Sequence, residues 1–418
     1  PHNMWRRLSL LLALSAGVAL SAGVALSAGA QKAGLLPSPH THARLQGIAL
    51  EDRRYAGQVG LGPLGSNVTG ARRIANLVQK RCSTHNLLST TGRWMRILNT
   101  TATPPLVYRM EHKANDGMRI HDQKRKLNSS LQPWPEYLMW QWHPLKGCKL
   151  PIATHDDFCQ ALEALQLSRI FIVGDSMQWN MAQSLWKVLS KQPGDPTKVH
   201  SKRNGKIIQS QVICGTGSNA RHVQFKFFLN NRLTNCTDRS WEGPFEFFPW
   251  VHEYVADARP TLLLAHMGAH VHSIAAYEEA MASFMRSVAL RNSSSLDRVI
   301  FRTATPGQAS CDDHSRPFSR PIDFELREGG LSNISFHWDL HPLFNSIAAR
   351  EIARAARGRI RDRIALLDVY QMTSMRPDGR RGGGDCLHFF LPGVPDWWTH
   401  KLLVQLRHWA ARLVRRPS

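Results

Sequence analysis

The sequence predicts an α/β protein in which a parallel sheet is flanked by helices on both faces. The first observation is a set of short apolar runs rich in β-branched residues, which are typical of strands buried on both faces. The second is that segments with helical periodicity separate these runs, which favours βαβ units and therefore a parallel sheet. A third is the composition of 43% apolar and 20% charged residues, which indicates a folded chain.

Residues 1–30 predict a signal peptide or a signal anchor. An uncharged run from residue 8 to residue 30 follows Arg6 and Arg7, and ends in a small-x-small pattern typical of a cleavage site. About 20 apolar residues also suffice to span a bilayer, and the flanking positive charges do not decide between the two. In both cases we expect most of the chain to cross a membrane. Six Asn-x-Ser/Thr acceptors favour a lumenal or extracellular location.

The rest of the chain divides into three expected parts. Residues 31–80 contain Pro, Gly and scattered Arg without a sustained period, which predicts a stem or linker. Residues 81–150 predict an irregular N-terminal lobe, and residues 151–418 the α/β domain. Helices are expected at 155–167, 177–189, 274–290, 341–356 and 396–414. Strands are expected at 170–173, 222–229, 261–265, 299–302 and 364–369.

Charge and cysteine content narrow the class of partner. The net charge of +22 is spread along the whole chain, which permits an acidic glycan, a membrane surface or nucleic acid as partner. Because the sequence has neither zinc-finger spacing nor an RNA-binding signature, we do not expect nucleic acid. The seven cysteines form no C-x-x-C pair, which argues against a zinc ribbon. In a secreted chain they fit three disulfides and one spare thiol.

The first chemical signal is the stretch around Ser176. Gly174 and Asp175 break the apolar strand 170–173, and helical periodicity begins at Met177. The hydroxyl of Ser176 therefore lies near the free N–H groups of the first helical turn, which can stabilise the oxyanion of acyl transfer. The alternative is that Asp175 or Ser176 only caps the helix.

The second signal lies near the C-terminus, where Asp385 and His388 stand three residues apart after the last expected strand. The carboxylate can hold one imidazole nitrogen while the other faces a nucleophile. Ligand sites in open α/β sheets lie at the carboxyl ends of strands, where Ser176 is also expected. Together the three residues predict a nucleophile, an orienting acid and a base. The alternative for this pair alone is a hydrogen-bonded histidine in a surface loop.

These two motifs resemble those of the trichome birefringence-like family. The similarity rests on Gly174-Asp175-Ser176 after an apolar strand and on the long motif from Asp385 to Asp396, and it covers roughly residues 140–414. Members of this family are plant and algal polysaccharide O-acetyltransferases within the PC-esterase group, which is related to the Gly-Asp-Ser (SGNH) hydrolases. The resemblance therefore implies a three-layer α/β fold. The resemblance further implies Ser176 as acylated nucleophile, His388 as base and Asp385 as its partner.

The resemblance also implies a location and a set of disulfides. Members of the family are Golgi type II membrane proteins with a lumenal catalytic domain, which would here be residues 151–418, and secretion is the alternative. Disulfides would brace the site, and we expect Cys82 to pair with Cys148 and Cys311 with Cys386.

The segment after the third expected strand departs from the family pattern. The family has Asn in an Asn-x-Gly-x-His setting, whereas this chain has His266, followed by Gly268 and His270. The ring of His266, or the backbone N–H groups of Ser176 and Gly268, would then stabilise the oxyanion. His270 is either a site residue or a core histidine. Arg302 would bind donor or glycan, or pair with a buried carboxylate. With Gly174 and Asp175, these residues complete the expected oxyanion and substrate site.

Three functions remain open. The first is O-acetyl transfer to a polysaccharide, possible without metal or bound cofactor, with acetyl-CoA or another acetyl carrier as co-substrate. The second is hydrolysis of the same acyl-serine by water, which would make the chain a carbohydrate acetylesterase. The third is non-catalytic binding of acidic polysaccharides through the net charge of +22.

Overall fold

The computed structural model describes residues 82–97, 135–144, 147–190, 207–233, 250–291, 296–322, 334–358, 360 and 362–414. The expected signal segment and stem lie outside the described residues. Within the described part of the chain, no helix combines the length and apolarity needed to cross a membrane.

A six-stranded sheet organises the fold, in the order β4-β5-β3-β6-β7-β8. Neighbouring strands from β5 to β8 run parallel, and β4 pairs antiparallel to β5 at the edge. The strands are β3 (Arg169–Gly174), β4 (Ile207–Cys214), β5 (Arg221–Leu229), β6 (Thr261–Ala265), β7 (Arg298–Arg302) and β8 (Ile364–Leu367). The predicted α/β class is confirmed, with the correction that one edge strand makes the sheet mixed.

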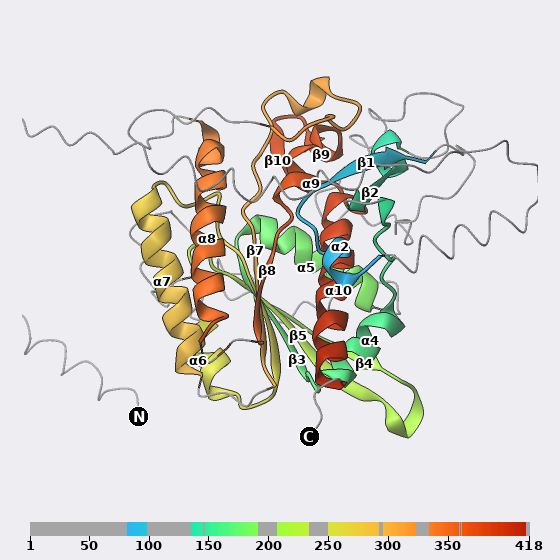
Figure 1. Cartoon of the computed structure of the whole chain (residues 1–418), viewed down its shortest axis with the longest axis vertical. Coiled ribbons are helices and arrows are strands. Elements are labelled where there is room, and N and C mark those ends of the chain that lie inside the picture. Colours follow the sequence, from blue (N-terminus) through green and yellow to red (C-terminus); the bar gives the residue numbers. More distant parts are fainter. Residues whose placement is uncertain are drawn as a thin grey trace, which may run out of the picture. The chain divides into compact units, whose positions relative to one another are not determined.

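Helices cover both faces of this sheet (Figure 1). One core is formed with the helices α4 (His155–Ala164), α5 (Ser176–Leu189) and α10 (Val394–Val414). The other is formed with the helices α6 (Trp250–Ala256), α7 (Ile274–Leu290) and α8 (His341–Ala355). The central strands β3, β6 and β7 are buried along their whole length. Their continuous apolar runs thus supply both cores, since successive side chains point to opposite faces.

Side-chain caps explain where the helices begin. Thr154 accepts from Asp157 N–H while the Asp157 carboxylate accepts from Thr154 N–H, a capping box that begins α4. Ser273 caps α7 through Ala276 N–H. Asp175 caps α5 by accepting from the N–H groups of Met177 and Gln178, so α5 begins at Ser176, immediately after β3.

Two small antiparallel pairs lie outside the main sheet. Strands β1 (Gly92–Arg96) and β2 (Trp140–Pro144) pair within the segment expected to be irregular. Strands β9 (Arg380–Gly382) and β10 (Asp385–Phe389) pair across a turn of three glycines. The second pair places Asp385 and His388 on a short strand, and not in the surface loop that was the alternative for these two residues.

Short helices complete the described fold. They are α2 (Thr84–Leu87) and α9 (Tyr370–Ser374), together with 3-10 turns that include Glu136–Met139 and Ser335–Leu340.

Three disulfides join described segments. They connect Cys82 with Cys148, Cys159 with Cys214, and Cys311 with Cys386. The first and third are the expected pairs, and the second joins α4 to the end of β4. The seventh cysteine, Cys236, lies outside the described residues.

Candidate active site

Ser176 is placed by the sharp passage from β3 to α5. The chain can turn there because residue 174 is glycine: a Cβ on Gly174 would lie 2.6 Å from the carbonyl oxygen of His266 and 2.7 Å from Cβ of Gln178. Ser176 is then the first residue of α5, at the carboxyl end of a central parallel strand. This is where open α/β sheets place their ligand sites.

His388 and Asp385 complete a hydrogen-bonded chain with this serine. His388 Nε2 lies 2.8 Å from Ser176 Oγ, and His388 Nδ1 lies 2.8 and 3.0 Å from the two carboxylate oxygens of Asp385. An ionised carboxylate can only accept, so Nδ1 carries the proton and donates it, which leaves Nε2 as the acceptor for the serine hydroxyl. The structure therefore brings the three predicted residues together, although Ser176 and His388 are 212 positions apart in the sequence.

The surroundings of Asp385 keep its carboxylate ionised. Partial burial alone would raise its pKa, but the hydrogen bond and charge of His388, with the cation of Arg381, lower the pKa to about 2. Asp385 Oδ1 also accepts from the backbone N–H of His388 at 3.1 Å. A carboxylate that stays charged can orient the neutral imidazole and stabilise the imidazolium once the base has taken a proton.

Three contacts fix the β9–β10 pair against α5. Asn180, one turn after Ser176, accepts from the backbone N–H of Phe389 at 3.3 Å. The buried guanidinium of Arg380 donates to the carbonyl oxygens of Leu387 and Pro306. The disulfide of Cys386 anchors the strand to the segment after β7. His388 lies between these contacts, so its distance from Ser176 is set by the backbone on both sides.

Asn180 and Arg380 were not among the site residues predicted from the sequence. The spacing of Asn180 was the available signal, because residues four apart lie on the same face of a helix. Nothing in the local sequence marks Arg380, whose two acceptors come from strand β10 and from the segment after β7.

The rings and charges behind Ser176 form a buried cluster. His266 Nδ1 donates to the carbonyl oxygen of Arg302 at 3.2 Å, and His266 Nε2 lies 3.4 Å from Asp175 Oδ1. Both nitrogens therefore face groups other than Ser176. Burial lowers the pKa of His266, and the nearby cation of Arg302 lowers it further. The role of His266 as an oxyanion donor stays a prediction, and in this geometry it requires the ring to turn.

The Asp175 carboxylate lies at the centre of this cluster. Burial would raise its pKa, but interaction with His266, followed by His270 and Arg302, outweighs burial and holds the pKa below its usual range. The N–H groups that Asp175 accepts from act in the same direction, because they stabilise the charged form.

Arg302 is fully enclosed in the same cluster. Its Nε donates to Gln178 Oε1 at 2.9 Å and its guanidinium lies 4.5 Å from the ring centroid of Trp398. Burial lowers the pKa of Arg302 to about 9. Its Nη2 is buried without a hydrogen-bond partner in the described part of the chain, so one donor of this guanidinium is left unsatisfied.

The remaining predicted residues lie close to these groups. A Cβ on Gly268 would lie 2.8 Å from Cβ of Ala304, so only glycine fits there without a shift. His270 is partly exposed and its ring meets that of Phe336 edge to face at 6.1 Å. Side chains that could hold a metal ion cluster twice among the described residues, and neither cluster contains Ser176, Asp385 or His388.

Comparison with known proteins adds a family and a set of relatives. Residues 264–406 match the PC-Esterase model, described as the GDSL/SGNH-like acyl-esterase family found in Pmr5 and Cas1p. These residues include Asp385 and His388, and Ser176 precedes them.

The relatives are plant proteins with low but extended identity. Protein trichome birefringence-like 6 of Arabidopsis thaliana is 24% identical over 65% of this chain, which spans 62% of that protein. Probable xylan O-acetyltransferase 8 of Oryza sativa subsp. japonica is 22% identical over 73% of the chain and 81% of that protein. Xyloglucan O-acetyltransferase 4 of Populus trichocarpa is 25% identical over 65% of the chain and 72% of that protein.

Proposed function

The chain is a PC-esterase family protein related to the trichome birefringence-like proteins, and from this premise we propose that it is a polysaccharide O-acetyltransferase. Two relatives are named for O-acetyl transfer to xylan and to xyloglucan, which supports a polysaccharide acceptor. The observation that carries the proposal is the distance of 2.8 Å between Ser176 Oγ and His388 Nε2, with Asp385 on the other ring nitrogen.

In the first half-reaction the serine becomes acetylated. His388 Nε2 takes the hydroxyl proton while Ser176 Oγ attacks the carbonyl carbon of an acetyl donor, such as acetyl-CoA or another acetyl carrier. As the tetrahedral intermediate collapses, the leaving group takes that proton from His388. The acetyl ester of Ser176 remains, and Asp385 offsets the transient charge of the imidazolium.

In the second half-reaction a sugar hydroxyl accepts the acetyl group. His388 takes the proton of that hydroxyl as its oxygen attacks the ester carbonyl, and returns it to Ser176 Oγ when the ester bond breaks. The same base thus serves both steps, and the side chains of the free protein are restored.

Backbone donors would stabilise the oxyanion in both steps. Asp175 already occupies the N–H groups of Met177 and Gln178, so the N–H of Ser176 itself is the donor at the start of α5 that remains for the oxyanion. The backbone N–H of Gly268, in the segment after β6, would supply a second donor.

Replacing the nucleophile tests this proposal. The Ser176→Ala protein is expected to lose acetyl transfer to xylan or xyloglucan oligosaccharides by about 10⁴-fold or more, because no covalent intermediate can form. Mass spectrometry of the wild-type protein with donor alone should show one acetyl group on the peptide that contains Ser176. Ser190→Ala, at the other end of α5, is the matched control and should leave both measurements unchanged. Transfer at the wild-type rate by Ser176→Ala would overturn the proposal.

A second candidate function is hydrolysis, which the acyl-esterase description of the family favours. The side chains of His388 and Asp385 are 23% and 37% exposed, so water can reach the base. Incubation with an acetylated oligosaccharide distinguishes the two. Release of free acetate without transfer to an added acceptor would identify an esterase.

We also propose a Golgi location as a single-pass type II protein with a lumenal catalytic domain, with secretion as the alternative. The uncharged run 8–30 and the three disulfides support a secretory route. Imaging of a fluorescent fusion beside a Golgi marker, with protease protection of the C-terminal part, tests the location.

A further inference from the structure

The disulfide Cys159–Cys214 lies at the opposite end of the sheet from Ser176. Cys214 is the last residue of the antiparallel strand β4 and pairs with Arg221, the first residue of β5. It is therefore at the amino end of the parallel strands, whereas Ser176 follows the carboxyl end of β3. Any chemistry at this disulfide is separate from the candidate active site.

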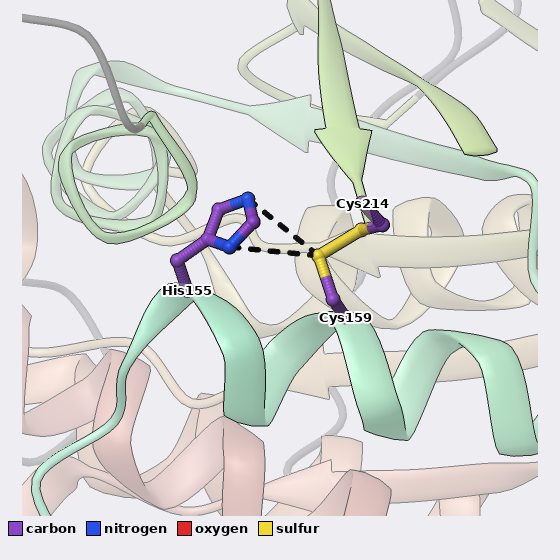
Figure 2. Close-up of side chains that lie close together, drawn as sticks. All are labelled: His155, Cys159 and Cys214. Carbon is purple, nitrogen blue, oxygen red and sulfur yellow. Dashed lines mark hydrogen bonds between the residues drawn. A yellow bond between two sulfur atoms is a disulfide. The ribbon is translucent and has the colours of Figure 1, made fainter. Parts of the chain in front are cut away.

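A histidine faces this disulfide. His155, one turn before Cys159 on α4, points its imidazole at the Cys159 sulfur, as Figure 2 shows. Nε2 lies 3.6 Å and Nδ1 3.8 Å from Cys159 Sγ. One ring nitrogen and the two sulfurs all lie within 4.8 Å of one another.

These separations are those of a tetrahedral zinc site. With Zn–N of ~2.1 Å and Zn–S of ~2.3 Å, the N···S edge of a tetrahedron is ~3.6 Å and the S···S edge is ~3.8 Å. The observed distance from Nε2 to Cys159 Sγ already equals the first edge. The two sulfurs, now bonded at 2.01 Å, would have to move apart by about 2 Å, and the ring nitrogen and Cys214 Sγ, now within 4.8 Å of each other, would have to reach the N···S edge.

The surroundings of His155 favour ligation through Nε2. Asp156 Oδ1 lies 2.9 Å from His155 Nδ1, so Nδ1–H can donate to the carboxylate and leave the lone pair on Nε2. Metal-bound histidines are typically oriented by such a carboxylate. In the disulfide form, Nε2 lies 3.0 Å from the carbonyl oxygen of Ile213, and that contact would give way to the metal. Cys159 and Cys214 are each 8% exposed and the His155 side chain is 10% exposed, so the cluster lies just below the surface.

We propose that His155, Cys159 and Cys214 form a Zn²⁺ site when their disulfide is reduced. A dithiol supplies two electrons and two protons, becomes a cyclic disulfide itself, and leaves two protein thiols. Zn²⁺ then displaces both thiol protons and binds two thiolates and the neutral imidazole, with water in the fourth position. The metal then holds α4 to the end of β4, as the disulfide does in the oxidised protein.

The other cluster of potential ligands fits zinc less well. It consists of Cys311, Cys386 and Asp312, and contains no histidine. The Asp312 carboxylate already accepts from the backbone N–H of Gly383 at 2.8 Å. Ligation there would leave that N–H without its acceptor.

Cobalt substitution tests the site on the full-length chain. The protein is first reduced with a water-soluble trialkylphosphine and is then titrated with Co²⁺ or Zn²⁺. The phosphine becomes a phosphine oxide and competes less for metal than a dithiol does. We expect one equivalent of Co²⁺ to give thiolate-to-cobalt charge-transfer absorption with tetrahedral d–d bands, and Zn²⁺ to displace it. With Zn²⁺ bound, Cys159 and Cys214 should resist alkylation in peptide-resolved mass spectrometry.

Variants assign the ligands. Asp156→Asn should lower Zn²⁺ affinity by about 10- to 100-fold, and His155→Ala by more, because the first acts through the ring and the second removes a ligand. His222→Ala is the matched control, because His222 lies on the β4–β5 hairpin that also carries Cys214 but contacts Gln211 and not the disulfide. This variant should bind Zn²⁺ like the wild type.

Three results would overturn the proposal. One is that the reduced protein binds no stoichiometric Co²⁺, including the case in which reduction unfolds it. Another is that His155→Ala binds as tightly as the wild type. The third is that Zn²⁺ protects Cys311 and Cys386 while Cys159 and Cys214 are alkylated.

Discussion

The buried Arg169 and Arg291 at the amino end of the central sheet are more completely paired than the buried Arg302 at its carboxyl end. At the amino end, Arg169 donates to Thr261 Oγ1 at 2.8 Å and pairs with Asp257 at 2.9 Å. Arg291 pairs there with Asp297, and further donors of both guanidinium groups reach backbone carbonyl oxygens. These charges are buried with their partners in place, so this end is built as a structural element.

At the carboxyl end of the strands, several buried polar atoms lack a hydrogen-bond partner among the described residues. Arg302 Nη2, Asp175 Oδ2 and Gln178 Nε2 are all buried without a hydrogen-bond partner among the residues that the structure describes. A buried polar atom without a partner costs about 1–3 kcal/mol, so such a group calls for an explanation. All three belong to residues that surround Ser176, where a substrate or ordered water would supply the partners. The contrast separates groups that hold the fold from groups kept available for a ligand.

The largest expected effect lies at the carboxyl end. Asp385→Asn should lower acetyl transfer by about 10⁴-fold, because an amide can donate to Nδ1 and favour the wrong tautomer of His388. Its free energy of unfolding near pH 7 should change little, since Asp385 is partly exposed. Turnover and urea unfolding measure the two effects. Asp362→Asn, at a surface ion pair, is the control and should keep the wild-type turnover. A fall in its activity would mean that the loss is not specific to the carboxyl end of the sheet.

At the amino end, the loss should appear in stability. Asp297→Ala removes the partner of Arg291 and the acceptor of Thr261 N–H, so the free energy of unfolding should fall by about 3–5 kcal/mol. The turnover number of the protein that remains folded should equal that of the wild type. Glu278→Ala, at an exposed pair with Arg350, should leave the urea midpoint unchanged. A large loss of turnover in folded Asp297→Ala would contradict the division between the ends.

Arg302→Met sharpens the same contrast. Because one donor of Arg302 is already without a partner among the described residues, its removal should cost about 1–3 kcal/mol of unfolding free energy, mainly from the lost bonds to Gln178 Oε1 and to the carbonyl oxygen of Thr303. Urea denaturation of Arg302→Met and of Asp297→Ala under the same conditions ranks the two losses of unfolding free energy. A cost above that of Asp297→Ala would mean that Arg302 is as firmly paired as Arg291.

The smallest expected effect concerns His400, which belongs to neither end. It accepts from Ala153 N–H at 3.1 Å, and burial lowers its pKa to about 3. Because the unfolded state binds a proton near pH 6.5 and the folded state does not, acidification favours unfolding. Between pH 7 and pH 6 this histidine alone should remove roughly 0.7 kcal/mol. His400→Gln should show a weaker pH dependence in urea midpoints, and an equal dependence would exclude His400 as its source.

The sequence was sufficient for the elements that have one dominant signal. Strands β6 and β7 contain the continuous apolar runs 262–265 and 299–301, and α7 follows a clean helical period. Strand β4 was missed because Gln209, Ser210 and Gln211 interrupt its apolar pattern, as is common in an edge strand with one face toward solvent. Strand β10 was missed because Gly382, Gly383 and Gly384 predict a turn, which they do form, but not the pairing on either side of it.

The residues of the candidate site likewise differ in whether the sequence alone could predict their place. Ser176, Asp385 and His388 could be predicted because each lies in a local motif whose chemistry is specific. The ring of His266 could not, because its orientation depends on Asp175 from one strand end and the carbonyl of Arg302 from another. Such contacts between distant segments have no signature in either segment alone.

The separation of Ser176 from His388 has a consequence for how this chemistry can be altered. The proposed nucleophile follows a central strand of the main sheet, whereas the proposed base lies on a two-stranded ribbon outside that sheet. The length and composition of the turn at Gly383 and Gly384 can therefore vary, whereas Leu387 and Phe389 of β10 belong to the hydrophobic core that contains α5 and have to be kept. An engineer who exchanged this ribbon between homologous chains would shift the position of the proposed base, provided that these two core side chains were retained.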